Sequence, residues 1–480
     1  MAYVPLQAVE FSHSPLITFI IGLIAVIALL VWLDLPAFVG LIMAAFTVGV
    51  VNTVFVPDFG AADAGSRVAA AFGDNMAGIG IPILMAAVIG KSMLESGAAQ
   101  RIVRGFQNVL GESNSDISLL GSSTFLAVPV FFDSVFYLMA PLARSMRARV
   151  GRDYTLFLVV VGAGAATTHV FVPPTPGPLA VAAEIDTDLG MTIAIGIATA
   201  IPAAILAGLV YGRWINARLD IPLRDTMSTT TEELEDVADK PTSTLPGMLE
   251  ASAPIILAVV LIASLTIVEG FGDVLPSLEA IRPITAFLGD KNVALTVAAL
   301  AAAYSFRRHN DLSRSEWADE LTEALKSGGN IAAITAAGGA FGALLAASGI
   351  GDYLAGALEG VGIGLLVTAW LIAAIVRIAQ GSATAAMLTA AGIMAPLTSQ
   401  LGVHPAYLVM VIGAGANIFS WYNDSGFWLV KEIGGLTQAE TLQTWTVLTT
   451  IISISGLLTT LIFSTLFPYP IEQLGAVLPL

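Results

Sequence analysis

The sequence predicts an all-helical protein that crosses the membrane many times and consists of two inverted halves. The first observation is composition: 56% of the 480 residues are hydrophobic and 12% are charged, whereas soluble domains carry about 25% charged residues. The second is that apolar stretches recur along the chain, each near the length of about 20 residues that one helical crossing needs. The third is that features of the first half return in the same order in the second, which indicates a duplication.

These properties exclude a soluble enzyme and predict a multi-pass protein of the cell (cytoplasmic) membrane, surrounded by the lipid bilayer. The N-terminal residues have no basic segment and no clear cleavage site, so the first apolar run is expected to stay as a helix and not to be a signal peptide. The chain has no cysteine, which excludes disulfides and thiolate metal ligands. A net charge of −16 favours a halophilic source over an ordinary acidic protein, and no basic stripe suggests a nucleic-acid partner.

One polar linker divides the chain. The segment Leu223–Gly247 is rich in threonine and acidic residues and poor in large apolar ones, which is typical of a mobile connector. The expected organisation is a first membrane repeat of residues 1–222, a cytoplasmic linker of residues 223–247 and a second, inverted membrane repeat of residues 248–480.

Four features return in both halves. Each half has a Gly/Ala-rich segment, then the motif GAGA inside an apolar run, then a helix-breaking cluster and then a glutamate before a last apolar helix. In first-half and second-half order, the Gly/Ala-rich segments are Asp74–Gly97 and Gly329–Gly349, the GAGA motifs are Gly162–Ala165 and Gly413–Ala416, the breaking clusters are Pro173–Pro178 and Tyr422–Phe427, and the glutamates are Glu184 and Glu432.

The basic residues orient the halves. Excess Lys and Arg marks cytoplasmic loops, and these residues gather in four places: Arg101 and Arg104; Arg144, Arg147, Arg149 and Arg152; Arg213, Arg218 and Arg224; and Arg307, Arg308, Arg314 and Lys326. A single apolar stretch, Asp116–Ala143, separates the first two groups, so it must enter and leave on the same side. We therefore expect a re-entrant hairpin that turns at Ala127–Val135.

The second half is expected to contain a matching hairpin at Gly360–Gln400, with its turn at Ala379–Thr384. Each half then has about five transmembrane helices plus one hairpin, and the odd number of crossings inverts the second half. The four broken segments should meet near the membrane midplane, where secondary transporters place their substrate site.

The broken segments also carry a family resemblance. The stretches PVFFDSVFYLMAPLA, THVFVPPTPGPLAVA, VRIAQGSATAAMLTAAG and NDSGFWLVKEIGGLTQAETLQTWTV together resemble the gluconate permease family, the gluconate:H⁺ symporters of the ion transporter superfamily. The resemblance extends from about Gly73 to Phe467. It implies proton-coupled uptake of gluconate, a related sugar acid or a small hydroxy-carboxylate, no cofactor beyond the proton gradient, and a homodimer that works by an elevator mechanism.

Other functions remain to be weighed against this one. A Na⁺-coupled carrier or an exchanger of other small carboxylates would need the same broken helices, and so would an anion channel. An intramembrane enzyme is not expected, because the sequence contains no HExxH or GxSxG motif.

The breaks supply the expected substrate site. A helix that begins at a break presents free N–H groups and a positive dipole end, which suit a carboxylate; the alternative for the proline cluster alone is a turn outside the membrane. Neutral polar side chains suit sugar hydroxyls, and glycines allow the backbone to approach a ligand. The polar candidates are Ser134, Thr175, Gln380, Ser382, Thr384, Asn423 and Ser425, and the glycines are Gly177, Gly381 and Gly426.

Three side chains are candidates for proton coupling. Asp133 lies at the turn of the first hairpin, where an ionisable group is costly unless it is paired or functional; alternatively it reaches cytosolic water as an ordinary solvated carboxylate. Asp424 is the parallel candidate, or a helix cap. His169, beside the proline cluster, titrates near neutral pH, or is a neutral hydrogen-bonding residue. Arg377 keeps its charge, so it is expected to pair with the substrate carboxylate or with one of the two aspartates.

Overall fold

The computed structural model describes residues 13–33, 35–57, 59–60, 62–111, 114–224, 244–271, 276–350, 353, 364–422 and 424–469. Every regular element within these ranges is a helix. Most of the expected linker, residues 225–243, lies outside the described residues, so its position remains a prediction.

The helices confirm a polytopic membrane protein. Seven of them are long and apolar enough to cross a membrane, and the bent pair Arg282–Leu288 and Lys291–His309 makes an eighth. The ten crossings expected from the sequence are reached when the shorter apolar helix that starts at Ser14 and the broken pair Ala406–Ala416 and Ser425–Gly434 are added. The seven long spans are Phe38–Phe55, Asp63–Glu95, Tyr154–Glu184, Leu189–Asn216, Met248–Gly270, Arg314–Ala346 and Gln438–Leu466.

The elements of the two halves follow one another in parallel order. The first half contains α1 (Ser14–Ile27), η1 (Ala28–Trp32), α2 (Ala37–Phe55), α3 (Asp63–Glu95), α4 (Ala98–Leu110), α5 (Ser115–Leu126), α6 (Phe132–Val150), α7 (Tyr154–Phe171), α8 (Pro176–Glu184), α9 (Leu189–Ala204), η3 (Ile205–Val210) and α10 (Tyr211–Asn216). The second contains α12 (Met248–Phe271), α13 (Pro276–Glu279), α14 (Arg282–Leu288), α15 (Lys291–His309), α16 (Arg314–Ala346), α18 (Leu365–Gln380), α19 (Ala383–Met394), η5 (Ala395–Gln400), α20 (Ala406–Ala416), α21 (Ser425–Gly434), α22 (Gln438–Thr441), η6 (Leu442–Thr446) and α23 (Val447–Leu466).

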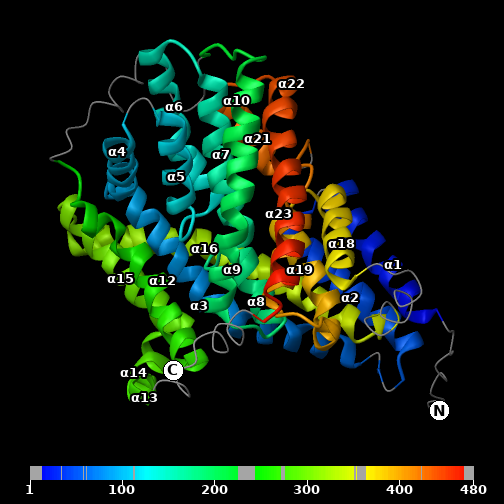
Figure 1. The fold of residues 1–480 in the computed structure, drawn as a ribbon. Helices are drawn as coiled ribbons and strands as arrows, with labels where there is room; N and C mark the ends of the chain where they lie inside the picture. The colour runs from blue at the N-terminus through cyan, green and yellow to red at the C-terminus, as the bar shows by residue number, and fades with distance from the viewer. Residues whose placement is uncertain are drawn as a thin grey trace.

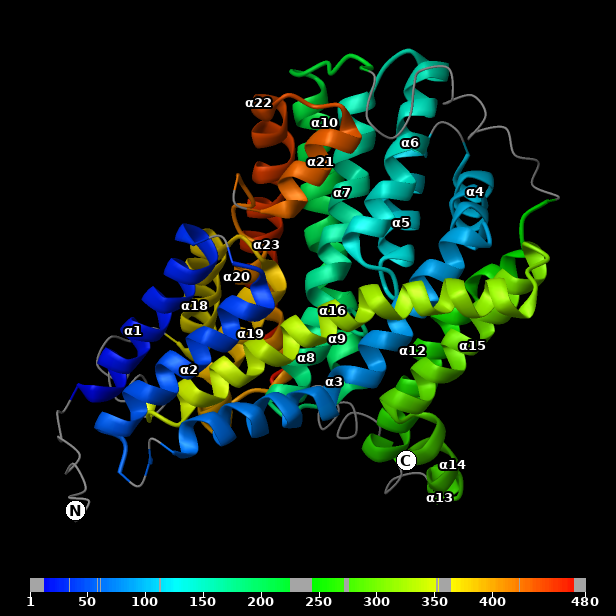
Figure 2. The same cartoon turned by 180° about the vertical axis from the view of Figure 1, so that it is seen from behind.

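Two helices of 33 residues, α3 and α16, occupy equivalent places in the halves and pack side by side. They run obliquely across the molecule, and Figure 2 shows α16 in front of the central helices. The upright group that includes α5, α6, α7, α10, α21 and α23 stands on one side of this pair, as Figure 1 shows. The segment α7–α8 lies in the centre, with 94% of its apolar window buried inside the protein.

The four helix breaks occur where the sequence predicts them. The first hairpin, α5–α6, turns between Leu126 and Phe132, and the second, α18–α19, turns at Gly381–Ser382. Gly381 has a φ of +85°, a left-handed conformation that favours glycine after the end of a helix. Helix α7 ends at Phe171 because the prolines that follow cannot continue it, and α8 restarts at Pro176. The fourth break separates α20 from α21.

Small residues let the helices approach closely. A Cβ atom added to Gly164 would lie 2.1 Å from Oγ of Ser123, and one added to Gly413 would lie 2.1 Å from the carbonyl oxygen of Val170. Two glycines face each other between α16 and α19, since a Cβ on Gly392 would lie 2.3 Å from Cα of Gly342. Backbone contacts of this kind fix the second hairpin on α16.

Ion pairs fasten the ends of the helices. Arg224, in the described first residues of the linker, pairs with Glu440 at 2.6 and 2.9 Å and donates to the carbonyl of Gly435 at 2.9 Å. The end of the first half is thereby attached to α21 and α22. Lys431 and Glu432 also form an ion pair, at 2.5 Å.

The close contact between α16 and α19 predicts that a glycine-to-alanine substitution there lowers the stability of the protein. Gly392→Ala should destabilise the protein by about 1–3 kcal/mol, because even a methyl group would push the two backbones apart. Gly329→Ala is the matched control, since a Cβ at this helical position would meet nothing within 4 Å, and alanine favours a helix over glycine by about 1 kcal/mol. Thermal unfolding in detergent should show a lower midpoint for the first variant only; equal midpoints would contradict the close packing.

Candidate functional site

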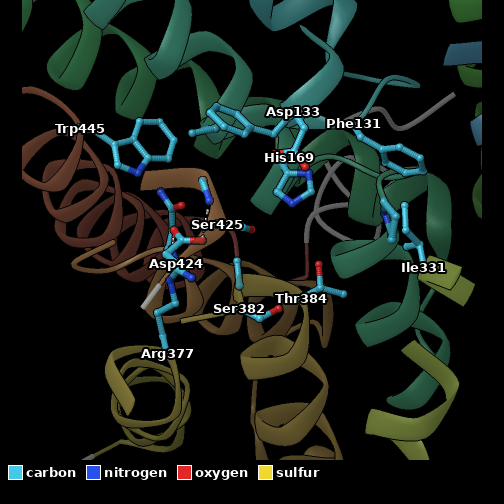
Figure 3. A pocket seen from close by; sticks show the side chains of 16 residues that line it. Phe131, Asp133, His169, Ile331, Arg377, Ser382, Thr384, Asp424, Ser425 and Trp445 are labelled. Atoms are coloured by element: carbon cyan, nitrogen blue, oxygen red, sulfur yellow. Dashed lines mark hydrogen bonds and ion pairs between the residues drawn. The ribbon is translucent and has the colours of Figure 1, made fainter. Parts of the chain in front are cut away.

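One cavity collects residues from all four breaks. Its volume is about 200 Å³, and Figure 3 shows side chains from several elements pointing into it. The lining residues are Phe131, Phe132, Asp133, Ala166, His169, Pro176, Ile331, Arg377, Ser382, Ala383, Thr384, Asn417, Asp424, Ser425, Gly426 and Trp445.

Four helices begin at this cavity. The first residues of α6, α8, α19 and α21 are Phe132, Pro176, Ala383 and Ser425, and all four line it. The N-terminal end of a helix carries a partial positive charge, and its first N–H groups have no partner within the helix. Four such ends around one cavity create a field that favours an anion.

A buried ion pair lies at one side of the cavity. The guanidinium Nη2 of Arg377 donates to Oδ2 of Asp424, and the two side chains are 3% and 10% exposed. Asp424 also accepts the hydroxyl proton of Ser420, and its Oδ1 accepts the backbone N–H of Gly426 at 2.9 Å. Asp424 therefore caps α21, one of the two roles expected for it, and it is the aspartate that pairs with Arg377. Its role in proton coupling stays a prediction.

Arg377 has donors to spare. Its Nε and Nη1 are buried and have no hydrogen-bond partner among the described residues, while the residue lines the cavity. Leaving buried donors unpaired is costly, so this guanidinium is suited to an acceptor beyond those that the described residues provide. Its planar fork matches a carboxylate better than an ammonium would.

A hydrogen-bond network holds the ion pair in place. Ser420 accepts the indole N–H of Trp445 at 2.6 Å, and the hydroxyl of Thr446 donates to the backbone carbonyl of Ser420 at 2.5 Å. The ring of Trp445 lies against Phe132, with 4.8 Å between centroids. The π-helical segment η6 therefore connects the tip of the first hairpin to the break before α21.

Asp133 and His169 lie on the other side of the cavity from Arg377 (Figure 3). Asp133 is in the first turn of α6, and its exposed side chain lines this cavity and a neighbouring one; its role in proton coupling stays a prediction. Nδ1 of His169 is buried and has no hydrogen-bond partner among the described residues.

Neutral polar groups complete the lining. Ser382 caps α19 by accepting the N–H of Ala385 at 3.3 Å, and Thr384 and Ser425 present hydroxyls from the first turns of α19 and α21. The amide nitrogen Nδ2 of Asn417 is buried without a partner among the described residues. These groups supply donors and acceptors to a ligand with several hydroxyls.

The structure gathers eight of the site residues expected from the sequence: Asp133, His169, Arg377, Ser382, Thr384, Asp424, Ser425 and Gly426. Others lie elsewhere. Ser134 lines a neighbouring cavity, and the Thr175 hydroxyl donates to the carbonyl of Val172 at 2.7 Å inside the break. Gly177 faces α19, since a Cβ there would lie 2.5 Å from the sulfur of Met387. Gly381 forms the hairpin turn. Asn423 and the side chain of Gln380 lie outside the described residues.

Sequence reasoning missed eight lining residues: Phe131, Phe132, Ala166, Pro176, Ile331, Ala383, Asn417 and Trp445. Most of them are apolar neighbours of predicted residues. Asn417 did carry a signal, because it is a polar residue directly after the second GAGA motif. Nothing in the local sequence indicates that Trp445 or Ile331 reaches the cavity, because each comes from an element without a break there.

The sequence is similar to those of several known transport proteins. The family model described as "GntP family permease" matches residues 14–466. The chain is 33% identical over 444 residues to the high-affinity gluconate transporter of Escherichia coli (strain K12), covering 92% of this chain and 98% of the relative. It is 32% identical to the gluconate permease of Pseudomonas aeruginosa, covering 94% and 98%, and 30% identical to the Gnt-II system L-idonate transporter of Escherichia coli (strain K12), covering 92% and 98%.

A solved structure has a similar fold. The YdaH transporter of Alcanivorax borkumensis, described as having an unusual topology, superposes with a TM-score of 0.60 over 96% of this chain and 99% of its own. The two sequences are 14% identical, so the likeness concerns the fold alone.

The buried ion pair generates a prediction of stability. Asp424→Ala should destabilise the protein by about 3–5 kcal/mol, because it leaves the Arg377 charge buried without its partner. Adding Arg377→Met to that variant should restore a substantial part of the loss, because the uncompensated charge is then removed. Thermal unfolding of both variants in detergent tests this coupling, and additive losses would show that the two side chains do not interact.

Proposed function

This chain belongs to the GntP family of permeases, and on that premise we propose that it imports gluconate or a related sugar acid together with a proton. The chain is a multi-pass membrane transporter and not an enzyme. Its relatives are named for gluconate and L-idonate, which are hydroxylated carboxylates. One observation carries the choice of substrate class: the unpartnered N–H groups of Arg377 in a cavity where four helices begin.

The carboxylate of the substrate is proposed to bind at Arg377. The Nη2 atom of this residue is used by Asp424, so Nε and Nη1 are the donors left for a ligand. Charge-assisted hydrogen bonds to a planar carboxylate are stronger and more directional than neutral ones. The amide of Asn417 is a further donor for the same group or for the adjacent hydroxyl.

The hydroxyls of the substrate are proposed to bind toward the second hairpin. Ser382 and Thr384 lie in the first turn of α19 or just before it, and Ser425 begins α21. Hydroxyl side chains both donate and accept, so they suit a polyol whose hydroxyls also do both. The aromatic wall of Phe131, Phe132 and Trp445 excludes water from the carbon chain.

Charge balance supports proton coupling through Asp133. The Arg377 charge is already neutralised by Asp424, and Asp133 is a second carboxyl at the same cavity. A bound anion would therefore be the third carboxylate near a single fixed cation. Protonation of Asp133 removes one of these like charges, so binding of the anion and binding of a proton favour each other.

Transport by the purified protein in liposomes tests the function. Labelled gluconate should accumulate inside the liposomes above its equilibrium level when the proton concentration is higher outside. A sodium gradient alone should not drive this accumulation. Accumulation that follows sodium would contradict proton coupling, and mere equilibration under every gradient would indicate a channel.

Removal of the titrating carboxyl generates a prediction. Asp133→Asn resembles the protonated form, so the variant should bind and exchange gluconate but should not accumulate it with a proton gradient. In the natural protein, gluconate affinity should fall as the pH rises and Asp133 loses its proton, whereas the affinity of the variant should stay constant. Binding titrations between about pH 5 and 8 measure this difference; a variant that keeps the natural pH dependence would assign the proton to another group.

Replacing Arg377 with lysine tests the proposed contact with the substrate carboxylate. Arg377→Lys keeps the charge and a partner for Asp424 but has no second planar N–H group, so gluconate affinity should fall by roughly one to two decades, which corresponds to the loss of a charge-assisted hydrogen bond. The melting temperature without ligand should change much less. Ser382→Ala is the comparison for a single hydroxyl contact and should cost about one decade or less. Unchanged gluconate affinity in the lysine variant would show that the substrate carboxylate does not bind at Arg377.

A further inference from the structure

A second cavity, of about 420 Å³, begins on the far side of Asp133. It shares Asp133 with the substrate cavity, and α6 lines it with Asp133, Ser134, Tyr137 and Leu138. This spacing places the four side chains on one face of the helix. The opposite wall consists of Leu94 and Glu95 at the end of α3 and Leu429 of α21.

A third cavity, of about 620 Å³, continues from the second. The two share Leu94, Glu95 and Leu138. The third is bordered further by the corner between α3 and α4, by α6, by the end of α15 and by described residues at the end of the linker: Ser96, Gly97, Gln100, Val103, Met139, Leu142, Thr244, Leu245, His309 and Asn310. We call the two cavities together the vestibule.

The exposure of side chains agrees with an open path. Tyr137, on α6, is 57% exposed. Asp133 and Glu95 are exposed as well. The vestibule therefore leads from the substrate cavity, past Asp133, to the surface.

The mouth of the vestibule lies among the basic loops. His309 directly follows Arg307 and Arg308, and Gln100 directly precedes Arg101. Loops with excess Arg and Lys face the cytoplasm. The path from the substrate cavity is thus directed to the cytoplasmic side.

The described lining of the vestibule is acidic. Its charged side chains are those of Asp133 and Glu95, and no Lys or Arg lines it. His309 is bound to Glu250 at 3.2 Å, and Lys91, one helical turn before Glu95, is paired with Glu320 at 2.8 Å. Glu95 therefore presents a negative charge at the mouth.

We propose that the vestibule is the cytoplasmic release path of the transported anion and that Glu95 favours release by disfavouring the return of anions from the cytoplasm. This inference rests on the proposed function, because it takes the cargo to be an anion. The arginines of the surrounding loops raise the concentration of anions outside the path, and a carboxylate on the wall just inside them lowers it within the partly enclosed path. It should therefore weaken the apparent affinity on the cytoplasmic side more than on the outer side.

Thiol labelling tests the route, and the absence of cysteine from the chain makes single substitutions clean. Ser134→Cys should react with a membrane-impermeant thiol reagent in inside-out vesicles and not in right-side-out vesicles. Ser122→Cys is the matched control, because Ser122 is buried at 0% exposure in α5 and should react in neither. Labelling of Ser134→Cys from the outer side alone, or from neither side, would overturn the route.

Gluconate separates this inference from the proposed function. If both hold, saturating gluconate should slow the labelling of Ser134→Cys from the cytoplasmic side. Labelling with the expected sidedness but without any effect of gluconate would leave the route intact and contradict the substrate. Protection by gluconate combined with labelling from the outer side alone would support the substrate and contradict the route.

Kinetics test the role of Glu95. In Glu95→Gln the KM for gluconate presented at the cytoplasmic face should fall about two- to five-fold at low ionic strength, and the difference should shrink in high salt. The KM at the outer face should not change. Glu323→Gln is the control, because it removes the same charge at an exposed residue that does not line the vestibule and is paired with Lys326 at 2.9 Å. An unchanged cytoplasmic KM in Glu95→Gln, or the same decrease in Glu323→Gln, would overturn the role of Glu95.

Discussion

The buried pair of Arg377 and Asp424 is the interaction on which the rest of the site depends. Two charges removed from water are stable only when geometry and additional hydrogen bonds compensate for their lost hydration. Here Ser420 and the N–H of Gly426 satisfy Asp424, and Trp445 fixes Ser420 in turn. The pair joins the second hairpin to the break before α21, so both segments keep one relative position. The same pair neutralises the arginine, and the proposed proton coupling through a separate carboxyl rests on this charge balance.

A membrane explains why the breaks converge. Backbone groups without partners cost several kcal/mol each in hydrocarbon, so interrupted helices are tolerated only inside the protein or beside water. All four interruptions of this chain therefore gather around one cavity. The helices that restart there direct their positive ends inward, and the cost of breaking a helix is offset by a field that attracts an anion. Packing on α3 and α16, through glycines that allow contact between backbones, keeps these ends in place.

Much of this arrangement could be predicted from the sequence, because proline, glycine and charge patterns mark breaks and loops directly. The four breaks and the positions of Arg377, Asp133 and Asp424 followed from such local signals. The direction of side chains within a break did not, since it depends on the neighbouring helix: Gly177 packs on Met387 and Thr175 bonds to its own turn. Trp445 could not be found either, because a π-helical segment rotates it toward the cavity. Its distance of 25 residues from Ser420 along the chain hides their contact.

The duplication has a consequence for the orientation of the ligand. Each half contributes two of the four helix ends at the cavity, α6 and α8 from the first, α19 and α21 from the second. The electric field of the backbone is therefore close to symmetric about the cavity and by itself cannot distinguish the head of a ligand from its tail. A sugar acid has a charged head and a neutral tail, so its orientation must come from side chains in which the halves have diverged. The cation on the second hairpin and the carboxyl on the first are such a difference. Side chains that differ between the halves, and not the backbone, therefore give the cavity its polarity.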